Sequence, residues 1–222
     1  MNLHSSQDRD RLRILLVRHG QSEANAQRIY QGQNDSPLSS LGKTQAVNLA
    51  KRLRLNGYDF DQIYSSDLIR AAETTRIIVT QMEAVTCPVI YTPLLREMDL
   101  GSYSGRNMDN LNADEQTYLD TIWKERSKRF PGGESVNMLV HRLKEFMIRV
   151  EELPPLSATI LVVTHGGPIY HILSSILGLL EGFSFGWFEN CKINVIERIN
   201  NACKDPEWKL LTINDNVWLE GK

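Results

Sequence analysis

Two histidines stand in the same local context, after an apolar run and directly before a glycine. His19 follows an apolar run that ends in Arg18, and His165 follows one that is continued by Thr164. A neutral imidazole is a nucleophile or a base near pH 7, and an arginine offers a fork of N–H donors that matches phosphate oxygens. The two segments therefore indicate an anion site with a nucleophilic histidine in it.

Glycine after each histidine removes a side chain at that point. We expect Gly20 and Gly166 to leave a backbone N–H free to approach an anion beside the start of a following helix. The other histidines, His4, His141 and His171, lack this context and are interpreted as core or surface residues.

The elements that must position these histidines alternate between strands and helices. Strands are predicted over Arg13–Arg18, Gln62–Ser65, Pro88–Thr92 and Thr159–Val163, with two late strands near Lys192–Arg198 and Lys209–Ile213. Helices are predicted over Leu38–Leu55 with a stop at Gly57, over Leu68–Ala84, over Ser135–Leu153, and after Pro168. Such alternation predicts a three-layer α/β/α fold with a mostly parallel central sheet. Ligands bind at the carboxyl ends of such strands, so the two histidines share a pocket if their strands are neighbours.

The segment from about Leu100 to Phe130 is polar and lacks a regular apolar pattern. We interpret it as a short lid over the active site rather than as a separate domain. The whole chain, residues 1–222, is thus predicted to be one domain, with a frayed tail over residues 1–11.

Composition excludes several classes of protein. With 41% hydrophobic and 23% charged residues, the 222-residue chain is neither disordered nor fibrous. A net charge of −2 does not indicate a surface that binds nucleic acid, and no apolar run is long enough to span a membrane. No secretory signal is present, and three cysteines without a C-x-x-C pair predict neither disulfides nor a metal site. We expect a cytoplasmic protein without metal or cofactor.

Further motifs show that the chain resembles the histidine phosphatase superfamily, which also holds the cofactor-dependent phosphoglycerate mutases. The segment Leu16–Asn25 (LVRHGQSEAN) is similar to the family signature. The other matching motifs follow in the family's order: Gln31-Gly32 with Asp35, Pro37–Ser39 and Gly42; Ser65–Thr74; Leu95–Gly101; Pro131–Ser135; and Val163–Gly167.

The resemblance implies a role for each matching residue. His19 is implied to be the nucleophile, and Glu97 to protonate the leaving oxygen and then to deprotonate water. The phosphate oxygens would be held by Arg18, Arg70, His165 and Asn25. Further phosphate- or substrate-binding positions would be Gly20, Gln21, Ser22, Gln31, Gly32 and Gly166.

The chemistry of phosphoryl transfer agrees with these roles. Its in-line transition state spreads charge over three equatorial oxygens, and cationic donors placed around them stabilise it without a metal. A covalent intermediate divides one difficult displacement into two easier ones. A basic cluster at Lys124, Arg126, Lys128 and Arg129 lies in the lid, and one of these cations is a candidate to contact a second anionic group of the substrate.

The sequence favours a hydrolase over a mutase. The lid is short, Gly167 stands where mutases of the family usually have asparagine, and the lid lacks the adjacent arginine pair that mutases use for a carboxylate. We therefore expect a metal-independent phosphomonoester hydrolase that forms a phosphohistidine on a small phosphorylated metabolite. The alternatives are a 2,3-bisphosphoglycerate-dependent phosphoglycerate mutase and a catalytically inactive binding module. A homodimer is compatible with the apolar residues at Phe183, Phe185, Trp187 and Phe188.

Overall fold

The strands form one mixed sheet at the centre of the molecule. The computed structural model describes residues 11–83, 85–152, 158–179, 185–199 and 207–215. The strands are β1 (Arg11–Arg18), β2 (Gln62–Ser66), β3 (Val89–Thr92), β4 (Ala158–Thr164), β5 (Ile193–Ile199) and β6 (Glu207–Asp215), in the order β3-β2-β4-β1-β5-β6. The first four in this order are parallel, while β5 is antiparallel to β1 and β6 to β5.

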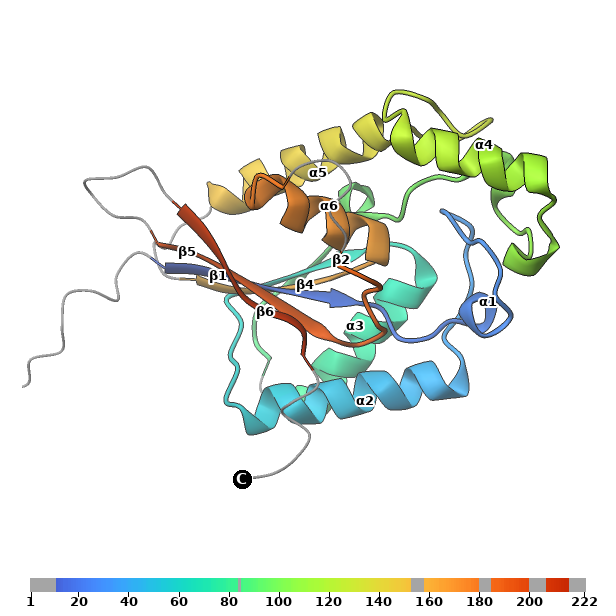
Figure 1. The fold of residues 1–222 in the computed structure, drawn as a ribbon. Helices are drawn as coiled ribbons and strands as arrows, with labels where there is room; N and C mark the ends of the chain where they lie inside the picture. Colours follow the sequence, from blue (N-terminus) through green and yellow to red (C-terminus); the bar gives the residue numbers. More distant parts are fainter. Residues whose placement is uncertain (1–10, 84, 153–157, 180–184, 200–206, 216–222) are drawn as a thin grey trace, which may run out of the picture.

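Helices cover both faces of the sheet (Figure 1). The helices are α1 (Glu23–Ala26), α2 (Ser40–Leu55), α3 (Ile69–Met82), α4 (Ala113–Lys124), α5 (Val136–Glu151) and α6 (Gly166–Ile176), with short 3₁₀ turns at Pro93–Leu95, Gly101–Tyr103 and Met108–Asn110. Because side chains alternate along a strand, Ile14 and Leu16 join the core under α5 and α6, whereas Leu15 and Val17 join the core over α2 and α3. The predicted three-layer α/β/α fold with a mostly parallel sheet is confirmed.

The lid segment contains a helix that its apolar pattern did not predict. Helix α4 begins with a capping box, in which the side chains of Asn112 and Glu115 bond each other's backbone N–H. Its buried apolar residues are Leu119 and Ile122, which is too short a stripe to recognise by period alone. The spacing of Asn112 and Glu115, which is that of a capping box, was the signal in the sequence for the start of this helix. In Figure 1, α4 lies on the α5–α6 side of the sheet, beyond the carboxyl ends of the parallel strands.

The other boundaries agree with the predictions to within a few residues. Helix α2 ends next to Gly57, whose φ of 67° is the left-handed conformation expected after a helix. Helix α3 ends at Met82, two residues early, because Glu83 turns the chain with a φ of 57°. Residues 1–10 of the predicted tail, Leu153 and Phe183 lie outside the described residues. Arg11, predicted to belong to the frayed tail, is instead the first residue of β1, where it pairs with Ile199 of β5. None of the helices in the described part of the chain is long and apolar enough to cross a membrane.

Candidate active site

The two histidines predicted to share a pocket face each other at the ends of neighbouring strands. Arg18 is paired with Thr164 in the register of β1 and β4, and the backbone N–H of His19 donates to the carbonyl of Thr164 at 2.9 Å. The rings of His19 and His165 meet edge to face, with centroids 5.0 Å apart. Both residues are buried. The expected juxtaposition is therefore confirmed.

The His19 ring is held in one tautomer by its own neighbour. Nδ1 lies 2.6 Å from the carbonyl oxygen of Gly20, which can only accept a hydrogen bond. In the neutral ring the proton is therefore on Nδ1, and Nε2 carries the lone pair. The side-chain amide of Asn190 donates to the carbonyl oxygen of His19 at 2.7 Å and fixes the backbone that carries the ring.

Burial and nearby cations keep the His19 ring neutral. Burial lowers the pKa of His19 well below its usual value, and the positive charges of Arg70 and Arg18 lower it further. The hydrogen bond to Gly20 acts in the opposite direction and is outweighed. A ring that stays neutral with its lone pair on Nε2 is in the form that can attack phosphorus.

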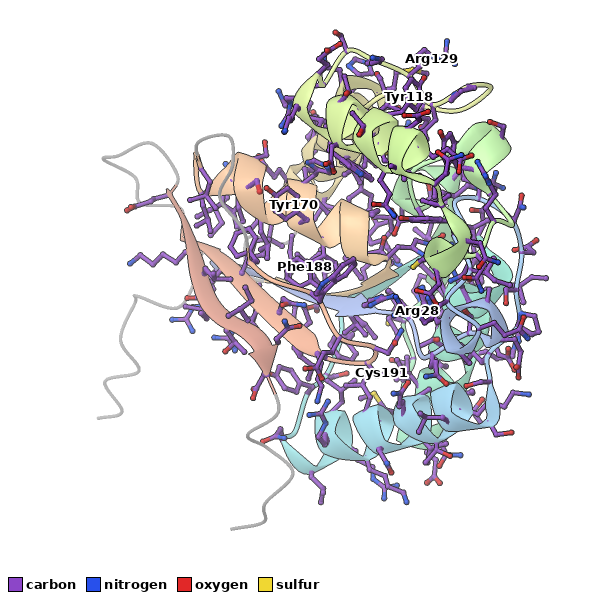
Figure 2. All side chains as sticks on the ribbon, turned by 45° about the vertical axis from the view of Figure 1, so that its right-hand side comes forward. Arg28, Tyr118, Arg129, Tyr170, Phe188 and Cys191 are labelled. Atoms are coloured by element: carbon purple, nitrogen blue, oxygen red, sulfur yellow. The ribbon has the colours of Figure 1, made fainter. Side chains whose placement is uncertain are left out.

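Two arginines lie beside His19, of which Arg70 is buried and Arg18 is half-buried. Arg70 donates to the carbonyl oxygens of Gly32 at 2.8 Å and of Asn34 at 2.9 Å. Arg18 donates to the carbonyl oxygen of Phe188 at 2.7 Å, and Figure 2 shows the labelled Phe188 beside the end of β1. Burial lowers the pKa of Arg18, and it brings that of Arg70 to about 10, so Arg70 stays cationic at neutral pH. In each guanidinium the buried Nε has no protein partner among the described residues.

His165 completes a set of buried groups with an unused nitrogen. Its Nε2 lies 2.8 Å from the hydroxyl oxygen of Ser66, while its Nδ1 is buried and has no partner among the described residues. Burial, with the charges of Arg70, His19 and Arg18, lowers the pKa of His165 well below its usual value. Buried polar groups normally have partners, so three unused nitrogens on His165, Arg18 and Arg70 fit a bound anion.

Glu97 lies against the first turn of α6, the helix that follows His165. Its Oε1 accepts from the backbone N–H of Met98 at 2.8 Å, and its Oε2 accepts from that of Gly167 at 3.3 Å. A Cβ on residue 167 would lie 2.4 Å from Oε1, so the carboxylate occupies space that only glycine leaves. Its negative charge opposes the lowering of the pKa of Arg18 and Arg70 by burial.

One expectation about Gly20 is contradicted. Its backbone N–H donates to the hydroxyl of Thr74 at 3.0 Å, so it is not free for an anion. Glycine is required there for another reason, because a Cβ would lie 2.5 Å from the carbonyl oxygen of Gly42 at the start of α2. Gly166 does open the helix after the second histidine, and a Cβ there would lie 3.9 Å from Nε of Arg18.

Several of the other predicted binding residues shape the turn after His19. The backbone N–H of Gln21 donates to Gln45, and its side chain accepts from Ser39. Ser22 caps α1, bonds reciprocally with Asn25 and donates to Gln31 at 2.8 Å. Gly32 turns with a φ of 52° and supplies a carbonyl to Arg70. Whether Gln21, Ser22, Asn25 and Gln31 also contact phosphate stays a prediction.

Two of the four cations of the basic cluster of the lid are bound to other protein groups. Lys128 pairs with Glu125 and lies over the ring of Tyr118, and Arg129 donates twice to the carbonyl of Gly133. In the part of the chain that the structure describes, no cluster of His, Cys, Asp or Glu side chains fits a metal ion.

Some residues of the site carried no recognisable signal in the sequence. Asn190 and Thr74 bond the backbone at His19 and Gly20, Ser66 bonds His165, and Arg142 bonds the carbonyl of Glu97. Thr74 and Ser66 lie within the Ser65–Thr74 motif, and this position was the one indication in the sequence that their hydroxyl groups lie near the site. Asn190 and Arg142 reach the site only through the fold.

Comparison with known proteins decides the family. The profile of the histidine phosphatase superfamily (branch 1) matches residues 14–216. The chain belongs to the histidine phosphatase superfamily. Its fold and its motifs are therefore those of a family of enzymes that act on small phosphorylated substrates.

Relatives of this histidine phosphatase family member carry the names of both mutases and phosphatases. A protein of Citrobacter koseri named "Probable phosphoglycerate mutase GpmB" is 34% identical over 211 residues, which cover 92% of this chain and 93% of the relative. The alpha-ribazole phosphatase from Shigella flexneri has a similar structure, with a TM-score of 0.75, 26% identity and coverage of 91% and 96%. A mycobacterial glucosyl-3-phosphoglycerate phosphatase has a TM-score of 0.76, 27% identity and coverage of 92% and 99%.

Proposed function

We propose that this protein is a metal-independent phosphomonoesterase that forms a phosphohistidine on His19 and acts on a small phosphorylated metabolite. The observation that carries the proposal is the 2.6 Å contact from Nδ1 of His19 to the carbonyl of Gly20. It leaves the lone pair on Nε2, in a site where Arg18, Arg70 and His165 each keep a buried nitrogen without a partner among the described residues.

In the first step Nε2 of His19 attacks phosphorus and the bond from phosphorus to the ester oxygen breaks. Glu97 donates its proton to the departing oxygen, which leaves as an alcohol. Arg18 and Arg70 neutralise the charge on the equatorial oxygens in the transition state. In the tautomer in which the Ser66 hydroxyl donates to Nε2, the proton of His165 is on Nδ1, and from there His165 donates to one of these oxygens.

In the second step water attacks the phosphohistidine. The carboxylate of Glu97 takes a proton from the water as the bond between phosphorus and Nε2 breaks, and inorganic phosphate leaves. General acid and base catalysis of this kind contributes on the order of 10²–10⁴-fold to a rate. The carboxyl is held by two backbone N–H groups on the side of the site where α6 begins.

The charges around the site support a substrate with one anionic group. The cations that depress the pKa of His165 are Arg70, Arg18 and Arg142, and Arg142 is already paired with Glu134. In the lid, Arg106 is paired with Glu115, and Lys128 and Arg129 are bound as described above. Of the other two cations of the cluster, Lys124 is exposed, and Arg126 lies near enough to the buried His171 for its charge to lower the pKa of that ring. A phosphoglycerate carboxylate would need a cation of its own. We therefore place the substrate's charge in a single phosphate group.

The mutase is the second candidate, because the relative from Citrobacter koseri carries that name. A mutase must exclude water from the phosphohistidine and return the phosphoryl group to a second hydroxyl. The short lid and Gly167 favour hydrolysis. An inactive binding module is the third candidate, and the cluster of buried charge speaks against it, since such charge is costly unless it serves a ligand.

The test measures phosphate release, with a chelator present, from glycerol phosphate and from 3-phosphoglycerate, which differ mainly in a hydroxymethyl and a carboxylate group. Hydrolysis that resists the chelator and prefers glycerol phosphate by kcat/KM is expected. Formation of 2-phosphoglycerate without phosphate release, on addition of 2,3-bisphosphoglycerate, would establish the mutase instead. A preference for 3-phosphoglycerate as a hydrolysed substrate would contradict the single-phosphate interpretation, and loss of activity with the chelator would contradict the metal-independent mechanism.

A further inference from the structure

Arg142 of α5 is the most heavily engaged arginine near Glu97, although no motif pointed to it. Its side chain is only 13% exposed. Nε and Nη2 donate to the two oxygens of Glu134 at 2.9 and 3.0 Å, Nη1 donates to the carbonyl of Leu94 at 2.8 Å, and Nη2 also donates to the carbonyl of Glu97 at 2.9 Å. Its planar fork therefore binds one carboxylate and two backbone carbonyls at once.

Glu134 extends the same network to the other side of Glu97. Its Oε2 accepts from the backbone N–H of Asp99 at 2.9 Å, and its own N–H donates to the carbonyl of Asp99 at 2.9 Å. The pair of Arg142 and Glu134 thus holds the backbone at residues 94, 97 and 99. Gln33 adds a further restraint, because its side-chain amide donates to the carbonyl of Glu97 at 3.2 Å.

This network restrains the segment that carries the carboxyl group rather than the carboxyl group itself. The carboxylate has separate partners, the N–H groups of Met98 and Gly167, and it fits against a glycine with no space to spare. A small shift of the backbone would therefore move the carboxyl away from the reacting oxygen or into α6. Displacements of about 1 Å at a reacting group cost on the order of 10²-fold in rate.

We propose that Arg142, together with Glu134, is a positioning residue that sets the place of the proton donor Glu97 relative to the phosphoryl site. The inference rests on the proposed function. A buried ion pair contributes little net stability compared with apolar packing, so its geometry is a better reason for its presence than its energy. Lysine at this position would keep the charge but could not hold the carboxylate and both carbonyls in one plane.

The leaving group distinguishes positioning from general stability. The p-nitrophenolate of an aryl ester such as p-nitrophenyl phosphate leaves without being protonated. The alkoxide oxygen of an alkyl ester such as glycerol phosphate must be protonated by the proton donor as it leaves. We would measure kcat/KM, which reports the step up to phosphoryl transfer, for both esters with the wild type, Arg142→Lys and Arg142→Met. Thermal unfolding of each variant checks its fold. Arg149→Lys is the matched control, because Arg149 lies on the same helix α5 and pairs with the carboxylate of Glu145, but it is exposed and does not touch Glu97.

We expect Arg142→Lys to lower kcat/KM for the alkyl ester about tenfold or more and that for the aryl ester severalfold less, so that the aryl-to-alkyl ratio rises. The ratio for Arg149→Lys should equal that of the wild type. Equal losses on both esters, or an unchanged alkyl ester, would overturn the positioning role while leaving the phosphatase in place. A wild type that hydrolyses neither ester would overturn the proposed function and this inference with it. If Arg142→Met fails to fold, the ratio for Arg142→Lys still decides.

Discussion

The imidazole of His165 meets the ring of His19 edge to face, with the two centroids 5.0 Å apart. The contact follows from the register of β1 and β4, which brings Arg18 opposite Thr164 and so aligns the residues that follow them. Both rings are held neutral by burial and by the same two arginines. In the proposed mechanism one ring is the nucleophile while the other donates a hydrogen bond, and neither carries a positive charge that the arginines would repel.

Glu97→Gln tests the assignment of the proton donor. The amide keeps the size of the side chain but cannot transfer a proton, so we expect kcat for an alkyl phosphate to fall by about 10²-fold or more. The inhibition constant of inorganic phosphate should change little, because the phosphate partners are other residues. Glu23→Gln is the control, since Glu23 is an exposed carboxylate at the first turn of α1. Full activity of Glu97→Gln across the pH range would show that another group is the acid.

The space beside Glu97 gives a second prediction, for two neighbouring glycines. In Gly167→Ala the new methyl group would lie 2.4 Å from Oε1 of Glu97 and must displace the carboxylate. We expect kcat to fall roughly tenfold or more while the fold is retained. In Gly166→Ala the nearest atom lies at an ordinary contact distance of 3.9 Å, so the loss should be smaller. Steady-state kinetics of the two variants check this, and equal activities would contradict the spatial argument.

The buried His171 predicts how stability depends on pH. Burial first, and the charge of Arg126 second, lower its pKa from 6.5 to about 4 in the folded protein. Between these values the unfolded chain binds a proton that the folded chain does not, so the free energy of unfolding falls as the pH falls from 6.5 to about 4. Because one bound proton changes this free energy by about 1.4 kcal/mol per pH unit, the loss amounts to about 3 kcal/mol at most.

Urea denaturation at about pH 7 and about pH 4.5 measures this loss in the wild type, in His171→Gln and in His141→Gln. The difference in unfolding free energy between the two pH values should shrink in His171→Gln. It should stay unchanged in His141→Gln, because His141 is exposed on α5. A pH dependence that is the same in all three proteins would show that His171 is not the titrating group.

Much of the site could be predicted because its residues sit at positions that the backbone fixes. His19 and His165 each follow a buried strand, and the parallel pairing of those strands dictates that they meet. The layers were predictable for the same reason, since the apolar runs at β1 and β4 are buried on both faces. The limits of α2 could be predicted because Ser39 is suited to cap the start of a helix and Gly57 to the left-handed conformation that follows its end.

Other parts of the site could not be predicted because they depend on contacts distant in sequence. The amide of Gly20 is taken by Thr74, and the carbonyl of Glu97 is held by Arg142, 45 residues away. Thr74 lies in a family motif but its partner does not follow from the motif, and Arg142 does not differ from an ordinary helical residue in the sequence. Helix α4 was missed because only Leu119 and Ile122 of its side chains are buried, so its period was too weak to recognise.

Detection of the phosphohistidine on His19 tests the central claim most directly. A rapid acid-free quench during turnover of a phosphomonoester, followed by peptide mass spectrometry under basic conditions, locates the bound phosphoryl group. Glu97→Gln should retain the adduct longer, since the base that activates water is missing. We predict one phosphoryl group on the peptide that contains His19, lost in His19→Ala together with nearly all turnover, and present in His141→Ala. Undiminished turnover in His19→Ala, or a phosphoryl group on another residue, would contradict the account.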